Sequence, residues 1–465
     1  MCKNDIILSL EKMKLQLESA FPADAPFELS RLAALSEEKD IDGKRFRVWT
    51  KALQAALDAH SVVRIDPSPE TYYIDGPVYM PSGRRILARG ARIQLTPGCR
   101  TVLLRNIHVT DGSNHPEDSC VPADENLSVE GGVWAESRDG RLGYGNSGCA
   151  DADNSLPGVS TCMLFSNVKD LHLKDMEFVN TAGFSVQIGA ARNVVTENLH
   201  FVRCFADGVH LNGNLENVLV RNSYGYVGDD LVALNPYDWD NSGINFGPAR
   251  RVFIDGVFSD PDSPYKAIRL QPGVYVYSEG GESHCRIDDL VLRRVKGIKS
   301  FKLYLQTPPY RDVPDHPARV GSCGSLYFED MDIDLNGQID AGLYEGVRHS
   351  AGYNIFGAFE ILADIEQAEF ENIRLTLHRD TLPESCLVSV GPKSMTGGNL
   401  YEVFDPYASC RVKRLRFSGI TVNGLPATSP RDLIRVIRMQ PNPDFPRTFP
   451  RGGDGRGQVE EVEIQ

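Results

Sequence analysis

The sequence predicts an all-β protein that folds as a single right-handed parallel β-helix with an N-terminal capping helix. Two families of short repeated segments predict this fold, together with the lack of amphipathic helices between them. A chain of 465 residues exceeds the usual size of one globular core. A solenoid avoids that limit, because each coil touches only its neighbours and the core grows along one axis.

The first family of segments repeats at a step of 23 residues. Its members alternate apolar and other residues, which is typical of short strands with one buried face. They are Cys162–Ser166, Ser185–Gly189, Gly208–Asn212 and Leu231–Asn235, followed at wider steps by Ala267–Gln271 and Lys302–Gln306. With the apolar flanks buried, the middle residues form one outward column: Leu164, Gln187, His210, Ala233, Arg269 and Tyr304.

The second family lies between members of the first and has two short apolar-alternating runs. The sixth position, between the two runs, is asparagine, aspartate, glycine or arginine, and in most members it is a turn former. Its members begin at Asp170, Asn193, Asn217, Arg251, Asp289, Ser325, Gln367 and Arg414. A doubly wound α/β fold would need helices of about 10–15 residues between strands, and the spacing leaves no room for them. The segments are therefore expected to coil into a stacked solenoid.

The two ends of the chain differ from this repeat. Arg47–His60 is amphipathic and predicts a helix that covers the open first coil. We expect an N-terminal segment with this capping helix over residues 1–60 and a β-helix with a catalytic cleft over 61–425. Residues 426–465 are rich in proline, glycine and charge, and are expected to form a tail that wraps the outside or frays.

Composition excludes some classes of partner. The net charge of −14 argues against a nucleic-acid ligand, since phosphate binding needs a basic surface. No run of about 18 apolar residues occurs, which excludes a membrane helix. The first residues lack the apolar stretch of a signal peptide, so we expect a cytoplasmic protein, or a secreted one if a signal was removed. The oligomeric state is not determined by these patterns.

Three carboxylates stand together at the start of two neighbouring strands. Asp207 and Asp230 are 23 residues apart and so take equivalent positions on adjacent coils, while Asp229 precedes Asp230 and His210 and Arg269 flank the group. Clustering like charges raises the pKa of at least one member. That suits a general acid beside a water-activating base. Alternatively, aspartates at coil corners cap backbone amides.

The segments that carry these aspartates are similar to a known family. Phe205–Leu211 resembles the Asn-Thr-Asp-Gly-Ile/Phe-Asp motif of glycoside hydrolase family 28, the polygalacturonases and their relatives, and Gly228–Leu234 resembles its Gln/Gly-Asp-Asp motif. The resemblance implies an inverting glycoside hydrolase acting on a pectin-related or other glycan. It also implies that Asp229 is the general acid and that Asp207 and Asp230 activate the water.

Two motifs of that family are altered in this chain. Asn241–Arg250 contains no histidine where Gly-His-Gly is expected, and the Arg-Ile-Lys motif that binds the substrate carboxylate reads Arg269-Leu-Gln. Arg269 stays a candidate substrate-binding residue, and His210 could take the place of the missing histidine. Further candidates for substrate binding follow the same face: Gln187, Tyr304, Tyr237 and Trp239.

Other activities stay open, because β-helices also host polysaccharide lyases, epimerases, fructotransferases and non-catalytic carbohydrate-binding proteins. Arg269, His210 and Tyr304 could supply the base of a lyase. The loop with Asp238 and Asp240 lacks a full set of calcium ligands, so neither a metal nor another cofactor is expected. A cytoplasmic enzyme would meet small substrates, which favours exo action or an oligosaccharide.

Overall fold

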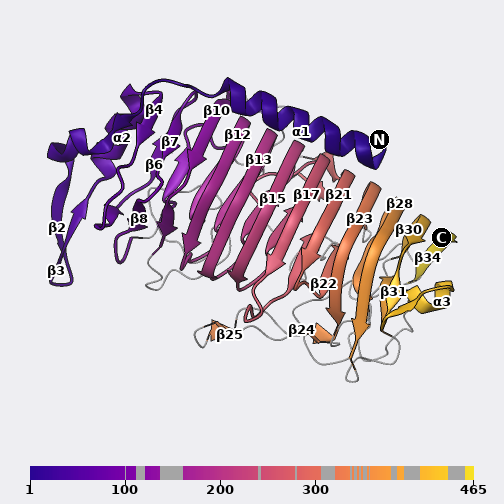
Figure 1. The fold of residues 1–465 in the computed structure, drawn as a ribbon. Helices are drawn as coiled ribbons and strands as arrows, with labels where there is room; N and C mark the ends of the chain where they lie inside the picture. The colour runs from indigo at the N-terminus through magenta and orange to yellow at the C-terminus, as the bar shows by residue number, and fades with distance from the viewer. Residues whose placement is uncertain are drawn as a thin grey trace.

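Strands of successive coils pair in parallel and in chain order, and this pairing defines a right-handed parallel β-helix (Figure 1). The computed structural model describes residues 1–99, 101–110, 121–136, 161–238, 242–277, 280–304, 320–335, 338–339, 343–344, 347–348, 353–354, 357–378, 385–391, 409–437 and 456–465. The predicted fold class is therefore confirmed.

The N-terminal part contains α1 (Lys3–Ala20), β1 (Phe27–Glu28), the 3₁₀ helix η1 (Leu29–Leu35), β2 (Glu37–Ile41), β3 (Lys44–Val48), α2 (Thr50–Ala59), β4 (Val62–Arg64), β5 (Tyr72–Ile74), β6 (Val78–Met80), β7 (Arg85–Leu87), β8 (Arg92–Leu95) and β9 (Leu104–Asn106). The central coils contain β10 (Asp124–Glu130), β11 (Val133–Ala135), β12 (Met163–Val179), β13 (Val186–Cys204), β14 (Val209–Asn212), β15 (Leu215–Val227), β16 (Val232–Asn235), β17 (Ala249–Ser259), β18 (Ala267–Leu270), β19 (Gly273–Val276), β20 (Glu282–Cys285), β21 (Ile287–Lys296) and β22 (Ser300–Tyr304). The C-terminal part contains β23 (Gly321–Leu335), β24 (Gln338–Ile339), β25 (Leu343–Tyr344), β26 (Val347–Arg348), β27 (Tyr353–Asn354), β28 (Gly357–Leu377), β29 (Cys386–Val390), β30 (Cys410–Ser418), β31 (Thr421–Val422), β32 (Leu425–Pro426), α3 (Pro430–Leu433), β33 (Ile434–Val436) and β34 (Gly457–Ile464).

Every turn former predicted at the sixth position of the second family adopts a left-handed backbone. These residues, all with positive φ, are Asp175, Asn198, Asn222, Gly256, Arg294, Asp330, Asn372 and Gly419. Glycine, asparagine and aspartate tolerate this conformation better than other residues, and it bends the strand without breaking the coil. The long strands β12, β13 and β28 are thus bent ribbons that run along more than one face of the solenoid.

The bends stack on one another through side-chain amides. Asn193 donates to Asp170 at 2.8 Å, Asn217 donates to Asn193 at 2.8 Å, and Arg251 closes the row with a 2.7 Å bond to Asn217. Asn198 repeats the arrangement at the next bend, donating at 2.7 Å to the aspartate of the preceding coil. Each bond satisfies a polar group at a corner and holds neighbouring coils in register.

The inward positions of the coils form the core as columns of stacked side chains. Phe178 stacks on Phe201 with ring centroids 5.7 Å apart, and Phe370 stacks between Phe328 and Phe417 at 5.1 Å from each. Such aromatic contacts add to the free energy gained by burying the rings. The core therefore continues from coil to coil along one axis.

Helix α1 was not predicted, and it covers an outward column of the solenoid (Figure 1). The column consists of His172, Val195, Leu219, Phe253, Val291 and Tyr327, which occupy equivalent positions on successive coils. The helix packs Ile6, Leu10, Met13 and Leu17 against it, and Phe21, directly after the helix, packs there too. Residues three or four apart rise about 5 Å along a helix, close to the coil spacing of about 4.8 Å, so each turn of α1 meets one coil.

Ion pairs fix the two ends of α1. Near its start Lys3 lies 2.5 Å from Glu329 and 2.6 Å from Glu371, and near its end Lys14 contacts Glu197. The helix thus ties together coils that lie far apart in the sequence. No helix among the described residues is long and apolar enough to cross a membrane.

The predicted capping helix is confirmed as α2, which buries Ala52, Leu53, Ala56 and Leu57 against the first coils. The C-terminal segment differs from the prediction of a tail. Strand β33 pairs in parallel with β29, and β34 pairs with β30, so Ile434–Val436 and Gly457–Ile464 add strands to the last coil. The prolines and glycines that suggested a tail are concentrated in 438–455, which lie outside the described residues.

Replacing one buried leucine of α1 tests its role. Leu10 is 0% exposed and Leu8 is 67% exposed, on the same helix. Leu10→Ala should lower the stability by roughly 2–5 kcal/mol, because it removes apolar contacts with the column and leaves a cavity. Leu8→Ala should change it by about 0.5 kcal/mol or less. Thermal denaturation of the two variants measures the difference, and equal losses would contradict this packing.

Candidate active site

One outward column of the solenoid carries the candidate site. Its described members are Tyr79, Arg105, Leu164, Gln187, His210, Ala233, Arg269, Lys302, Glu360, Ser389 and Arg435. The placement of Tyr304 next to Arg269 was wrong: Arg269 pairs with Lys302, whereas Tyr304 pairs with Leu362. The error is a slip of two residues, which keeps the alternation of inward and outward residues unchanged.

Asp207 lies where the chain enters β14 and is 3% exposed. Its Oδ1 accepts the backbone N–H of Asp230 at 3.0 Å, and its Oδ2 contacts His210. A side chain on Gly208 would meet the carbonyl oxygen of Leu231 at 2.6 Å, so glycine is required next to the aspartate. Burial raises the pKa of Asp207, although the bond to His210 opposes this.

His210 is held between two carboxylates. Its Nδ1 lies 2.6 Å from Oδ2 of Asp207, and its Nε2 lies 2.7 Å from Oδ2 of Asp238. Phe184 covers the ring, with centroids 3.9 Å apart. Burial alone would lower the pKa of His210, but the two carboxylates outweigh it and raise the pKa to about 9. The ring is therefore an imidazolium with both nitrogens engaged.

Asp230 is 1% exposed and lies beside two cations. Nε of Arg269 donates to its Oδ2 at 3.0 Å, and Nζ of Lys302 lies 3.3 Å from its Oδ1. Lys302 in turn donates to the hydroxyl of Tyr265 and lies over its ring, 4.3 Å from the centroid. Burial would raise the pKa of Asp230, but Lys302 and Arg269 lower it below its usual value. Asp230 is thus an ionised carboxylate.

Asp229 is the half-buried member of the group. One oxygen from each of Asp207, Asp229 and Asp230 lies within 4.8 Å of the others. Oδ1 of Asp229 accepts no hydrogen bond from any described residue. Burial raises its pKa well above the ordinary value, and the charges of Asp230 and Asp207 raise it further. The pKa values of two adjacent aspartates are therefore shifted in opposite directions.

The charges of the cluster balance without a metal ion. Three cationic side chains, His210, Arg269 and Lys302, contact the carboxylates of Asp207, Asp238 and Asp230, and the pKa of Asp229 is raised well above its ordinary value. A divalent ion would have to displace these cations, whose contacts are buried. The three aspartates are close enough to ligate a metal, but the cations already present make them a poor match for one.

The other residues proposed for substrate binding have different surroundings. Gln187 is buried and its amide nitrogen donates to Asn212 and to the carbonyl oxygen of Ser242, at 2.8 and 2.6 Å. Tyr237 packs in an aromatic cluster with Phe246. The contacts of Gln187 and Tyr237 stabilise the local structure. Trp239 lies outside the described residues, as do the side chain of Tyr304 and Asp240.

A groove of about 510 Å³ lies on a different face of the solenoid. Its lining includes Arg89, Glu177, His200 and Tyr224, and Glu177, His200 and Tyr224 pair on three successive coils. None of its titratable side chains is buried, and His200 is paired with Glu177 at 3.0 Å. The convergence of buried charges makes the aspartate cluster, and not this open groove, the better candidate for catalysis.

Two residues of the site were missed in the sequence. Lys302 could have been found by aligning Ser300-Phe-Lys-Leu with Ala267-Ile-Arg-Leu, which puts lysine beside Arg269 and gives the register that the structure has. Asp238 was considered only as a calcium ligand. It lies in the segment after β16, and no repeat indicates that it folds back onto His210.

Comparison with known proteins identifies no family for this chain. No family model matches the chain, and no curated protein is significantly similar to it. The exopolygalacturonase of Thermotoga maritima is 10% identical with a TM-score of 0.44, covering 98% of this chain and 96% of that one. The family 28 exopolygalacturonase of Yersinia enterocolitica is 12% identical with a TM-score of 0.41, covering 95% of this chain and 78% of that one. The surface adhesin PfbA of Streptococcus pneumoniae is 10% identical with a TM-score of 0.42, covering 95% of this chain and 92% of that one. At these identities and TM-scores the function has to be argued from the site.

The imidazolium of His210 makes the stability depend on pH. Its pKa in the folded state is about 9, against 6.5 for a free histidine, so its contribution is complete below pH 6.5 and is lost as the pH rises through about 9. The loss should amount to roughly 3 kcal/mol, at ~1.4 kcal/mol per pKa unit. Thermal denaturation across this range should show the fall for the wild type and for the control His200→Gln. His210→Gln should remove it; an unchanged slope would show that His210 is not charged.

Proposed function

We propose that this protein hydrolyses a glycosidic bond in an oligo- or polysaccharide by general acid–base catalysis. The observation that carries the proposal is the opposite shift of two neighbouring aspartates: the pKa of Asp229 is raised and that of Asp230 is lowered. Where the surroundings of two carboxyl groups shift their pKa values apart, the group with the raised pKa can act as the acid and the group with the lowered pKa as the base.

Asp229 is the general acid in this proposal. It is the member of the cluster that is partly open to solvent, and it carries a proton that it can give to the leaving glycosidic oxygen. Its Oδ1 is buried and accepts no hydrogen bond from any described residue, so nothing at that oxygen stabilises the ionised form.

Asp230 is the base, with Asp207 beside it. Lys302 and Arg269 keep Asp230 ionised, and its Oδ1 accepts no hydrogen bond of good geometry from the described residues. A water bound between Asp230 and Asp207 would be oriented for attack on the anomeric carbon. Asp238 acts through His210, which it keeps in place against Asp207.

The sugar is not assigned to a uronate. Arg269 and Lys302 are the cations that could recognise a substrate carboxylate, yet both are buried and lie on Asp230. This favours a glycan whose recognition does not depend on them. Exo action on an oligosaccharide by a cytoplasmic enzyme remains our proposal for its mode and location.

Asp229→Asn tests the acid. Hydrolysis should fall by about 10²–10⁴-fold, because the amide cannot protonate the leaving group. Reducing ends released from a panel of oligosaccharides measure the rate, and the near-ultraviolet absorbance of an unsaturated product would reveal a lyase instead. The matched control is Asp332→Asn, which alters an exposed aspartate paired with Arg374 and should keep the wild-type rate. Wild-type hydrolysis by Asp229→Asn would rule out the proposal.

The configuration of the product tests the displacement. An inverting enzyme separates its acid and base by about 6.5–9.5 Å, and a retaining one by about 5–5.5 Å. One oxygen from each of the three carboxyl groups lies within 4.8 Å of the others. We expect inversion, as the family resemblance implies. NMR of the anomer that is released first distinguishes inversion from retention. A product with retained configuration would indicate that Asp230 acts as a nucleophile.

A further inference from the structure

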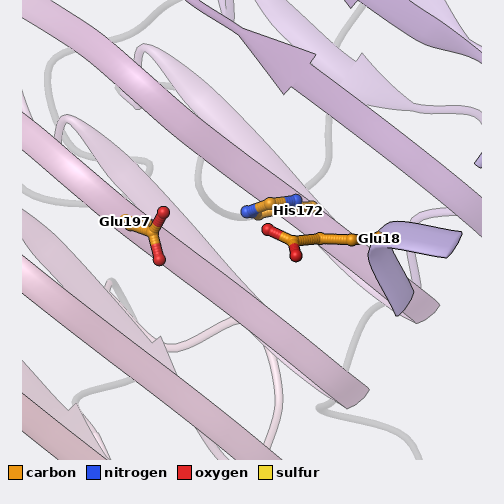
Figure 2. A group of neighbouring side chains, drawn as sticks. All are labelled: Glu18, His172 and Glu197. Atoms are coloured by element: carbon orange, nitrogen blue, oxygen red, sulfur yellow. The ribbon is translucent and has the colours of Figure 1, made fainter. Parts of the chain in front are cut away.

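A second cluster of ionisable residues lies where the end of α1 meets the solenoid. Glu18 comes from α1, His172 from β12 and Glu197 from β13, and one donor atom of each lies within 4.8 Å of the others. Figure 2 shows the carboxylate of Glu18 beside the ring of His172, with Glu197 to the left of both. The cluster is separate from the aspartate site, because it lies at the column under α1, to which His172 belongs.

His172 is the polar exception in that column. The equivalent residues of the next coils are Val195 and Leu219, and His172 is 4% exposed. Its Nε2 makes no hydrogen bond with any described residue. A buried nitrogen without a partner costs free energy, and an apolar residue would avoid that cost. Histidine at this position is explained if the nitrogen binds a ligand.

The donors match a transition metal. Imidazole nitrogen and two carboxylates form a set that Zn²⁺ accepts. A metal binds the lone pair of a neutral imidazole nitrogen, and Nε2 of His172 has no partner among the described residues. Around zinc, ligand atoms lie about 3.4 Å apart. Side-chain rotations that move the three ligand atoms by about 1 Å would therefore give this spacing.

Two lysines compete for this position. Nζ of Lys14 contacts Glu197 and lies 3.7 Å from Glu18, and Nζ of Lys174 lies 3.8 Å from Glu197. The ammonium of Lys14 shows that a cation is favoured between the two carboxylates. Lys14 is on the surface side of the cluster, with 15% of its side chain exposed, so its ammonium can return to water when a divalent ion enters.

We propose that Glu18, His172 and Glu197 bind a divalent transition metal of the Zn²⁺ type, in exchange for the ammonium of Lys14. The metal would link α1 to two adjacent coils, so its role is to fasten the helix and not to catalyse. Water would complete the coordination on the exposed side.

The test measures zinc binding to the whole protein after treatment with a chelator. Calorimetric titration with Zn²⁺ should show one site, and the melting temperature should rise with zinc and fall again with the chelator. His172→Leu, which introduces the residue of the equivalent position two coils away, should weaken binding about tenfold or more while the protein stays folded. Lys14→Met should bind zinc more tightly than the wild type, because the competing ammonium is removed.

Two further variants keep the result interpretable. Glu18→Gln removes a ligand from the exposed end of α1 and should weaken binding even if the histidine variant is unstable. His200→Leu makes the same substitution on another face, where it should leave zinc affinity unchanged. Absence of binding by both the wild type and Lys14→Met would overturn the proposal. So would equal binding by His172→Leu and the wild type, or a loss in His200→Leu, which would indicate an adventitious surface site.

Discussion

The structure depends on a backbone constraint: each coil has to turn at residues that accept a left-handed conformation. Asp175, Asn198 and Asn222 meet it at one corner on successive coils, and their amides and carboxylates bond from coil to coil. Because the corners stack, the register between coils is fixed at the bends and extends along the strands on both sides. The alignment of outward side chains, including the aspartates and the column under α1, follows from these corners.

A fixed register places charges where they cannot move apart. Asp207 and Asp230 stand on adjacent coils, so burying them requires compensating cations. Arg269 and Lys302, from the coils that follow, supply charge on one side, and the His210 imidazolium supplies it on the other. With those positions filled, Asp229 lowers the energy of the cluster by keeping its proton. The acid and the base thus result from one network of buried charges.

The parts of this structure that the sequence predicts are those governed by local or periodic rules. The bends, the coils and the cap formed by α2 each depend on residues close in the chain. The position of Lys302 could not be fixed by alternation, since a slip of two residues leaves the pattern unchanged. The contact of Asp238 with His210 and the docking of α1 join segments distant in sequence. The apolar residues at the outward positions Val195 and Leu219 were the available signal for α1.

The outward columns show two ways of closing the face of a solenoid. Under α1, apolar residues of the coils meet apolar residues of the helix, and water is excluded by packing. Around the aspartates, buried charged groups form ion pairs and hydrogen bonds with one another. In our proposal this network favours the protonated form of Asp229, the general acid. His172 lies in the apolar column under α1, but its side chain is polar, like those around the aspartates. A polar donor in an apolar column requires a partner that the coils do not supply, which is why its neighbours on α1 and β13 matter.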